Sequence, residues 1–429
     1  MDTVQRKEQV RKSLKYSVLD GSAWAAMMGL TQSYVTPLAL EMKATTSQVG
    51  LLSSMPSLMM ALSQLLTPDL SERAGSRKGF ILPVLFGHAI MFIPILLVHY
   101  IFHDSPVWWL IGFVTISSVL GAVINPAWGS MMADLVPEQL RGRYFAFRGR
   151  ITGFITLVFF FLAGVILQAF TDSDIFTGYA ILFGGATFFR LLSLYFLSRQ
   201  YEPAQAQEKA DSPGLVQLIK GLGNSTLGKF TLYIALIDLC TNVSAPFFAV
   251  FMLRDLNFSY LQFVMVSSTG TIANLVFLPF WGSRADRAGN IRIIQITSIL
   301  LPFVPLLWLV NTNAYYLMAA NAFSGFVWSG YGLSAVNFVY DASLPEIRTK
   351  QIAVFNAVDM IACCIGALAG GYITPHLPVL LDYRLRTLFT LSGLLRAAVV
   401  ILLLRRINEV RQVPRMTARE LLIGRNGKH

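Results

Sequence analysis

Twelve apolar segments, each about 20 residues long, dominate the sequence, and short polar stretches separate them. They cover residues 20–41, 47–68, 79–101, 107–133, 150–170, 176–198, 228–251, 259–281, 292–311, 315–341, 350–373 and 386–405. A helix of this length crosses the hydrocarbon core of a bilayer. Because lipid offers no hydrogen-bond partner to a bare backbone, each segment must be helical. The sequence therefore predicts an all-α membrane protein with twelve transmembrane helices.

The composition excludes two other classes of protein. Of the 429 residues, 55% are hydrophobic and 13% are charged. That charged share is about half the share usual in a soluble domain, so neither a cytosolic enzyme nor a disordered chain fits. The sequence has no Walker A loop, no His/Cys metal spacing and no Gly-x-Ser-x-Gly elbow. We therefore expect no catalytic residues, no bound metal and no cofactor.

Lysine and arginine predict the orientation of the chain, because they concentrate on the cytoplasmic side of membrane proteins. Of the 34 Lys and Arg residues, 28 fall in the two tails and in alternate loops, and four fall in the opposite loops. Both termini are therefore expected in the cytoplasm, with the protein in a bacterial inner membrane. The net charge of +11 then faces an anionic leaflet, and no nucleic-acid partner is needed to explain it.

The chain reads as two copies of one plan. Residues 72–75 (Glu-Arg-Ala-Gly) match residues 286–289 (Asp-Arg-Ala-Gly) at an offset of 214. Asp, Pro-Glu and Arg follow each other in residues 134–141 and again in residues 341–348, at offsets of 207 or 208. We infer a gene duplication. The predicted parts are a six-helix half (1–198), a cytoplasmic central loop (199–227), a second six-helix half (228–405) and a basic cytoplasmic tail (406–429).

The 6+6 plan and its loop motif resemble the major facilitator superfamily of secondary transporters. The family's loop between spans 2 and 3 runs Gly-x-Leu-Ala-Asp-Arg-x-Gly-Arg-Arg/Lys, and residues 68–78 here read Pro-Asp-Leu-Ser-Glu-Arg-Ala-Gly-Ser-Arg-Lys. Pro68 stands where the family has the first glycine, and Glu72 stands where it has aspartate. The resemblance implies a monomeric transporter of a small solute, working by alternating access between its halves.

The loop motifs are the candidates for a cytoplasmic gate. The resemblance implies that Glu72 lies at the N-terminus of span 11 and Asp286 at that of span 5, where the helix dipole favours a carboxylate. Gly75 and Gly289 are expected to permit a tight turn. The alternative is that these charges only set topology and loop shape. The candidate gate residues are Glu72, Arg73, Gly75, Asp286, Arg287, Gly289, Arg148 and Arg150.

Two acids, Asp238 and Asp359, fall in the middle of predicted spans. Each costs roughly 2.5–3.5 kcal/mol at the centre of a membrane helix, so each needs a partner or water. A desolvated carboxyl group can carry a proton or bind a cationic solute. The alternative is a buried acid that hydrogen-bonds its neighbours. Arg190 and Arg396, in spans 6 and 12, are expected to be structural and to extend toward the cytoplasmic surface.

Polar and aromatic residues are expected to line the solute path. The resemblance implies that spans 1, 4, 7 and 10 surround this path, and any single polar residue there more often joins two helices than binds solute. With the two acids, the candidate coupling or substrate residues are Gln32, Tyr34, Asn125, Asn242, Trp328, Tyr331 and Asn337.

Three functions remain open from the sequence. The first is a solute transporter, with protons as a possible coupling partner. The second is a permease for iron or another cation in a specialised membrane compartment, since residues 15–21 resemble the permeases of magnetosome gene clusters. The third is a transporter-like protein that does not transport and acts as a sensor or assembly partner.

Overall fold

The structure, a computed structural model, describes residues 3–73, 75–136, 140–202, 225–344 and 347–410. In these ranges the regular structure is helical, and the one isolated β-bridge joins Leu380 to Tyr383. The predicted all-α class is confirmed. Residues 215–222, whose sequence is compatible with a short amphipathic surface helix, lie outside the described residues.

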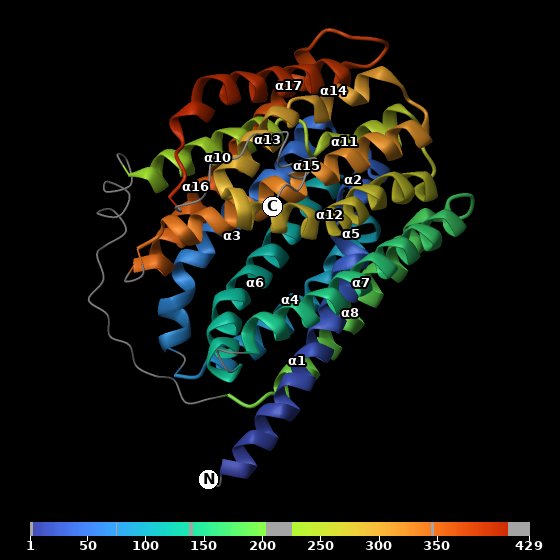
Figure 1. Ribbon diagram of the computed structural model, residues 1–429. Helices are drawn as coiled ribbons and strands as arrows, with labels where there is room; N and C mark the ends of the chain where they lie inside the picture. Colours follow the sequence, from blue (N-terminus) through green and yellow to red (C-terminus); the bar gives the residue numbers. More distant parts are fainter. Residues whose placement is uncertain (1–2, 74, 137–139, 203–224, 345–346, 411–429) are drawn as a thin grey trace. The chain divides into compact units, whose positions relative to one another are not determined.

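The first half of the chain places each of its six predicted spans on one helix or on two consecutive helices (Figure 1). The helices are α1 (Thr3–Thr31), α2 (Val35–Glu41), α3 (Thr46–Arg73), α4 (Arg77–Ile90), α5 (Phe92–Ile101), α6 (Pro106–Leu135), α7 (Arg141–Phe170) and α8 (Ile175–Ser198). The helix α1 begins well before residue 20, where the first apolar segment starts. The start of that segment therefore lies inside a helix.

The second half repeats this pattern. Its helices are α10 (Thr226–Asn242), α11 (Phe247–Val250), the π-helix η2 (Phe251–Asp255), α12 (Tyr260–Ala288), α13 (Asn290–Leu300), α14 (Phe303–Val310), α15 (Ala314–Ala342), α16 (Arg348–Ile373), the 3₁₀-helix η4 (Thr374–His376), α17 (Arg384–Leu403) and the 3₁₀-helix η5 (Leu404–Arg406). Among the described residues, nine of the twelve predicted spans are long and apolar enough to cross a membrane. The other three predicted spans also lie on helices, in α1 with α2, in α3 and in α15.

The first span of each half is broken into two helices. In the first half the break falls at Gln32–Tyr34, just before Pro37, and in the second half it falls just before Pro246. Proline lacks a backbone N–H and crowds the preceding turn, so it interrupts the helical hydrogen bonds. The same break at corresponding positions supports the duplication.

The described residues divide into two compact units. One unit comprises Met1–Lys209 and Met252–Val264, and the other comprises Ala210–Phe251 and Met265–His429. In the first unit α1 packs along α7 and α8, and in the second unit α10 packs along α16 and α17 (Figure 1). In each unit, therefore, the first predicted span of the half lies against the fifth and sixth spans of that half.

Glycines allow the closest of these helix contacts. A Cβ atom on Gly366 of α16 would lie 2.2 Å from the carbonyl oxygen of Leu239 in α10. One on Gly370 would lie 2.1 Å from the carbonyl oxygen of Val243. Glycine spaced four residues apart lets two helix backbones touch. The backbones of α10 and α16 therefore meet directly over this stretch.

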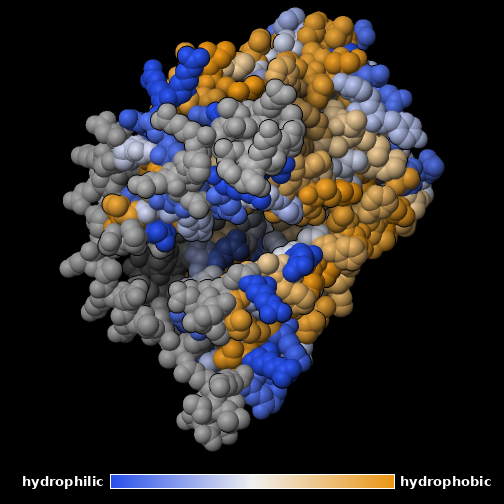
Figure 2. Space-filling model, viewed as in Figure 1, coloured by the Kyte–Doolittle hydropathy of each residue, from blue (hydrophilic) through white to orange (hydrophobic). Residues whose placement is uncertain are grey.

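The outward surface is apolar. Hydrophobic side chains cover much of the face shown in Figure 2, and large ones stand exposed on α7, α8 and α17, among them Phe154, Phe188 and Ile401. A soluble monomer rarely leaves so many large apolar side chains in water. Lipid is the solvent that this surface suits.

Candidate functional site

The two intramembrane acids that the sequence singles out lie together. Asp238 extends from α10 and Asp359 from α16, and the two carboxyl groups contact each other. Both residues are half-buried. The Oδ1 atom of Asp359 is buried and has no hydrogen-bond partner among the described residues. The glycine contacts between α10 and α16 hold the backbones close enough for this pairing.

Other polar groups of the same bundle face the acid pair. Arg396 of α17 lies within electrostatic reach of Asp238, and its side chain is 1% exposed. Its guanidinium donates to the backbone oxygen of Leu301 and to Ser244 Oγ, both at 3.2 Å. The phenol of Tyr331 on α15 is also near both acids, and its hydroxyl has no partner within the described part of the chain.

The charges of this cluster do not balance. Two ionised carboxylates against one guanidinium leave one negative charge inside an apolar bundle, which is costly. Two carboxylates in contact also disfavour double ionisation. One shared proton removes both costs, so the cluster is chemically suited to bind and release a single proton.

A third acid, Asp20 of α1, forms a similar cluster in the first unit. It is 4% exposed and accepts a hydrogen bond from Ser193 Oγ at 2.6 Å. Two guanidinium groups lie within its electrostatic reach, those of Arg148 on α7 and Arg190 on α8. The sequence analysis missed Asp20 because it stands at the edge of the first apolar segment. The sequence clue to Asp20 was the pair of arginines on the two helices that pack on α1, Arg148 on α7 and Arg190 on α8.

The two span arginines do not extend to the cytoplasmic surface, which corrects the prediction made for them. Arg190 is 4% exposed and Arg396 is 1% exposed. Arg190 donates through Nε to His88 Nδ1 at 2.9 Å and through Nη1 to Ser193 Oγ at 3.3 Å. Polar groups inside each bundle accept from Nε and Nη1 of Arg190 and from both terminal nitrogens of Arg396, so extension to water is not required.

Arg148, one of the predicted gate residues, packs against Trp128 and α1. Its guanidinium lies over the ring of Trp128, 4.4 Å from the ring centroid, and its Nε donates to the backbone oxygen of Ser17 at 3.2 Å. A Cβ atom on Gly21 would lie 2.5 Å from Arg148 Nη2. The missing side chain of Gly21 thus makes room for the guanidinium against α1.

The predicted lining residues have mixed environments. Tyr34 is fully buried, and its hydroxyl donates to the backbone oxygen of Phe160 at 2.5 Å, so it joins α1 and α2 to α7. Asn242 donates to the backbone oxygen of Asp238 within its own helix at 2.8 Å. Trp328 packs edge-on against Tyr331, with ring centroids 5.3 Å apart. Gln32 and Asn125 are exposed, and Asn337 is half-buried.

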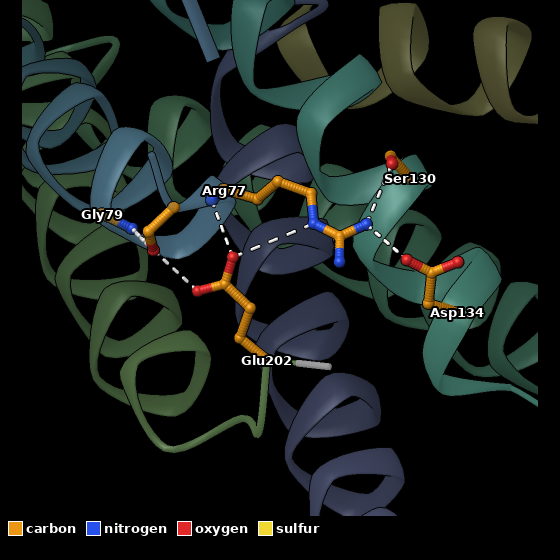
Figure 3. Close-up of polar contacts among 6 residues, drawn as sticks. Arg77, Gly79, Ser130, Asp134 and Glu202 are labelled. Carbon is orange, nitrogen blue, oxygen red and sulfur yellow. Dashed lines mark hydrogen bonds and ion pairs between the residues drawn. The ribbon is translucent and has the colours of Figure 1, made fainter. Parts of the chain in front are cut away.

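An ion cluster surrounds the buried Arg77 in the first unit (Figure 3). Arg77 is 2% exposed, and its Nη1 donates to Asp134 Oδ2 at 2.7 Å and to Ser130 Oγ at 3.0 Å. Glu202 accepts from the backbone nitrogen of Arg77 at 2.7 Å and from Ser76 Oγ at 2.7 Å. The carboxylate thus covers the N-terminus of α4, where the helix dipole stabilises it.

The second unit has a similar arrangement, in which Asn290 is a donor to the aspartate. Glu409 accepts from the backbone nitrogen of Ile291 at 2.8 Å, at the N-terminus of α13. Asp341 accepts from Asn290 Nδ2 at 2.8 Å. Glu202 and Glu409 are 207 residues apart, the same spacing as Asp134 and Asp341. The duplication therefore extends to two glutamates that the sequence analysis did not single out.

The two motif glycines adopt the backbone that the turn requires. Gly75 has φ +67° and Gly289 has φ +86°, values that side chains disfavour. Asp286, Arg287 and Arg150 are exposed. The side chains of Glu72 and Arg73 lie outside the described part, so their gate role stays a prediction.

Arg77→Lys is expected to destabilise the protein by on the order of 1–2 kcal/mol, because one ammonium cannot replace both Nη1, which bonds Asp134 and Ser130, and Nε, which lies 3.8 Å from Glu202. The partial exposure of Asp134, at 41%, keeps the figure low. Thermal unfolding in detergent measures the change. Arg143→Lys, at an exposed position on α7, is the matched control. Equal melting temperatures for the two variants would contradict a stabilising role for the cluster.

No group of three or more His, Cys, Asp or Glu side chains able to hold a metal ion occurs in the ranges that the structure describes. The fold is a duplicated bundle of membrane-spanning helices with paired charges inside each half. This is the construction of a secondary transporter.

The chain belongs to the major facilitator superfamily. The family profile matches residues 21–237 and 230–422, nearly the whole chain in two copies. The protein is therefore an integral, multi-pass membrane transporter and not an enzyme.

Solved structures share the fold at low sequence identity. A mutant of the nucleoside transporter NupG superposes with a TM-score of 0.74 at 12% identity, covering 93% of this chain and 100% of that one. A POT family transporter in complex with a thioalcohol-conjugated peptide gives 0.68 at 11% identity, covering 93% and 96%. A bacterial homologue of the human lysosomal transporter Spinster, inward-facing and occupied, gives 0.65 at 13% identity, covering 95% and 98%. Curated protein sequences yield no significant match.

Proposed function

We propose that the chain is a proton-coupled secondary transporter of a small solute, working by alternating access. The observation that carries this proposal is the contact between Asp238 and Asp359 inside one helix bundle. A carboxyl pair that holds one proton in one state and releases it in another links proton movement to the change of state.

Arg396 favours a proton over a metal or organic cation at this pair. A divalent cation needs several oxygen ligands and no competing positive charge. The guanidinium of Arg396 already lies within electrostatic reach of Asp238. Adding a second cation would bring like charges together in an apolar bundle, whereas a proton simply neutralises the excess carboxylate. The iron or cation permease is therefore the weaker candidate.

The polar groups left without partners favour transport over a purely structural or sensory role. Buried polar atoms usually find hydrogen-bond partners in a protein that only needs to be stable. Here Asp359 Oδ1 and the Tyr331 hydroxyl, both near the acid pair, are buried without partners in the described residues. Such groups suit a site that binds and releases a proton or solute.

Uptake into proteoliposomes tests the proposal. The solutes to test are uridine, dialanine, 5-aminolevulinic acid and lactate, the first three because the similar structures include a nucleoside transporter and POT family transporters with a peptide and with 5-aminolevulinic acid. We expect at least one solute to accumulate only when a pH gradient is imposed. Accumulation that is the same with and without the gradient would contradict proton coupling.

We also propose that Glu72 and Asp286 act as cytoplasmic latches. Replacing either with alanine is expected to slow turnover about two- to fivefold, the effect of losing a charge–dipole interaction of roughly 0.3–1 kcal/mol. Asp286 is exposed, so folding should not suffer. Initial rates of uptake measure the change, with Asp104→Ala, an exposed acid between spans 3 and 4, as the control. Turnover equal to that of the control would remove the latch role.

A further inference from the structure

The charged cluster around Asp20 in the first unit contains one more positive charge than negative charge. Asp20 supplies one carboxylate, while Arg148 and Arg190 supply two guanidinium groups. Among the residues that the structure describes, the other titratable groups near them add no negative charge. His88 accepts a hydrogen bond from Arg190 at Nδ1, and the Tyr144 hydroxyl donates to the backbone oxygen of Leu14. Asp20 and Arg190 are both 4% exposed and offset each other, so the unbalanced charge is that of the half-buried Arg148.

The excess charge belongs to Arg148. Arg190 is enclosed by the residues of its own cluster, with His88 and Ser193 as hydrogen-bond partners. Arg148 is half-buried, and its Nε donates to the backbone oxygen of Ser17. Its two terminal nitrogens donate no hydrogen bond within the part of the chain that the structure describes. They are therefore free to bind an acceptor from outside the protein.

Two neighbours, Trp128 and Gly21, define the position of the Arg148 guanidinium. The Arg148 guanidinium lies over the ring of Trp128, 4.4 Å from the ring centroid, and the Trp128 Nε1 donor is buried without a partner among the described residues. Gly21 leaves the space in which the guanidinium sits. The terminal nitrogens of Arg148 and the indole N–H of Trp128 are donors of the kind that carboxylates and phosphates accept from.

We propose that Arg148 and Trp128 bind the carboxylate or phosphate group of the transported solute. This inference rests on the proposed transport function and names the class of its solute as an organic anion. The charges agree with it, because an anion would neutralise the first unit's cluster just as a proton neutralises the acid pair of the second unit. Anion and proton together would move as a neutral pair.

Iodide quenching of tryptophan fluorescence tests the binding step without any transport. The full-length protein is placed in nanodiscs of phosphatidylcholine, and the Trp128 signal is the difference between the wild type and Trp128→Phe. We expect Arg148→Met to reduce iodide quenching of this signal by about fivefold, the effect of one unit charge about 4 Å away in water. Quenching by neutral acrylamide should not change. Arg143→Met, at an exposed position, should behave as the wild type does.

Gly21→Ala separates position from charge. Its Cβ would displace the guanidinium, which is the flexible end of a side chain, so folding is expected to survive. Iodide quenching should fall to a value between those of the wild type and Arg148→Met. Lactate or inorganic phosphate should compete with iodide in the wild type, and uridine should not.

Several outcomes would overturn the inference. Equal iodide quenching in the wild type and Arg148→Met would exclude an anion at this position. Competition by phosphatidylglycerol in the nanodisc, with none by lactate or phosphate, would assign the site to a lipid headgroup instead. Because these measurements need neither a pH gradient nor transport, their failure leaves proton coupling at Asp238 and Asp359 standing, and the reverse also holds.

Discussion

Asp238→Asn is expected to abolish proton-driven accumulation of solute while leaving downhill exchange in place. For one coupled proton, a gradient of one pH unit supports about tenfold accumulation, since one unit is worth 1.36 kcal/mol. An amide cannot take up that proton, so the variant should reach only equal concentrations on the two sides. Asp359→Asn should do the same, because each carboxyl group is the other's proton-sharing partner.

The matched control is Asp172→Asn, the same chemical change at an exposed acid between α7 and α8. It should accumulate solute as the wild type does. Counterflow of labelled solute, which needs no proton movement, shows that the Asp238 variant is folded and still binds. Wild-type accumulation by Asp238→Asn would contradict the proposed coupling, and loss of both accumulation and counterflow would point to a structural role.

Gly370→Leu is expected to prevent the second bundle from forming. Even a Cβ atom at this position would lie 2.1 Å from the backbone oxygen of Val243, and a backbone atom cannot rotate away. Overpacking of a core usually costs roughly 1–3 kcal/mol, and a backbone clash should exceed that range. Gly366→Leu, against the backbone oxygen of Leu239, should behave alike. Fluorescence-detected size exclusion measures the loss of monodisperse protein.

Gly332→Ala provides the comparison for these glycine variants. It lies on α15 of the same unit, and a Cβ atom there would meet nothing within 4 Å. Alanine also favours a helix by about 1 kcal/mol over glycine, so this variant should be as stable as the wild type or more so. A normal elution profile for Gly370→Leu would show that α10 and α16 do not need backbone contact.

The architecture could be predicted because it depends on patterns that the sequence displays directly. The apolar segments, each about 20 residues long, locate the helices, and the similar residues 72–75 and 286–289 indicate the duplication. The two motif glycines were expected in tight turns, and their positive φ values confirm it. Gly366 and Gly370 have the four-residue spacing that permits a close helix contact, and the structure places that contact between α10 and α16.

The polar clusters could be predicted only in part, because partners come from distant helices. Asp238 and Asp359 were conspicuous as acids in apolar segments, but their contact depends on how α10 packs along α16. Glu202 looked like an ordinary loop acid until the structure placed it on the backbone of Arg77. Asp20 stood at a segment edge, and only the packing of α1 on α7 and α8 buries it.

Infrared spectroscopy of aspartate carboxyl groups tests the central claim most directly, because it detects the shared proton without knowledge of the solute. The protein would carry isotope-labelled aspartate in lipid, with spectra recorded across the neutral pH range. We predict a protonated-aspartate band in the wild type that titrates with pH and is lost in both Asp238→Asn and Asp359→Asn. A band that persists unchanged in both variants, or no protonated aspartate in the wild type, would contradict the account.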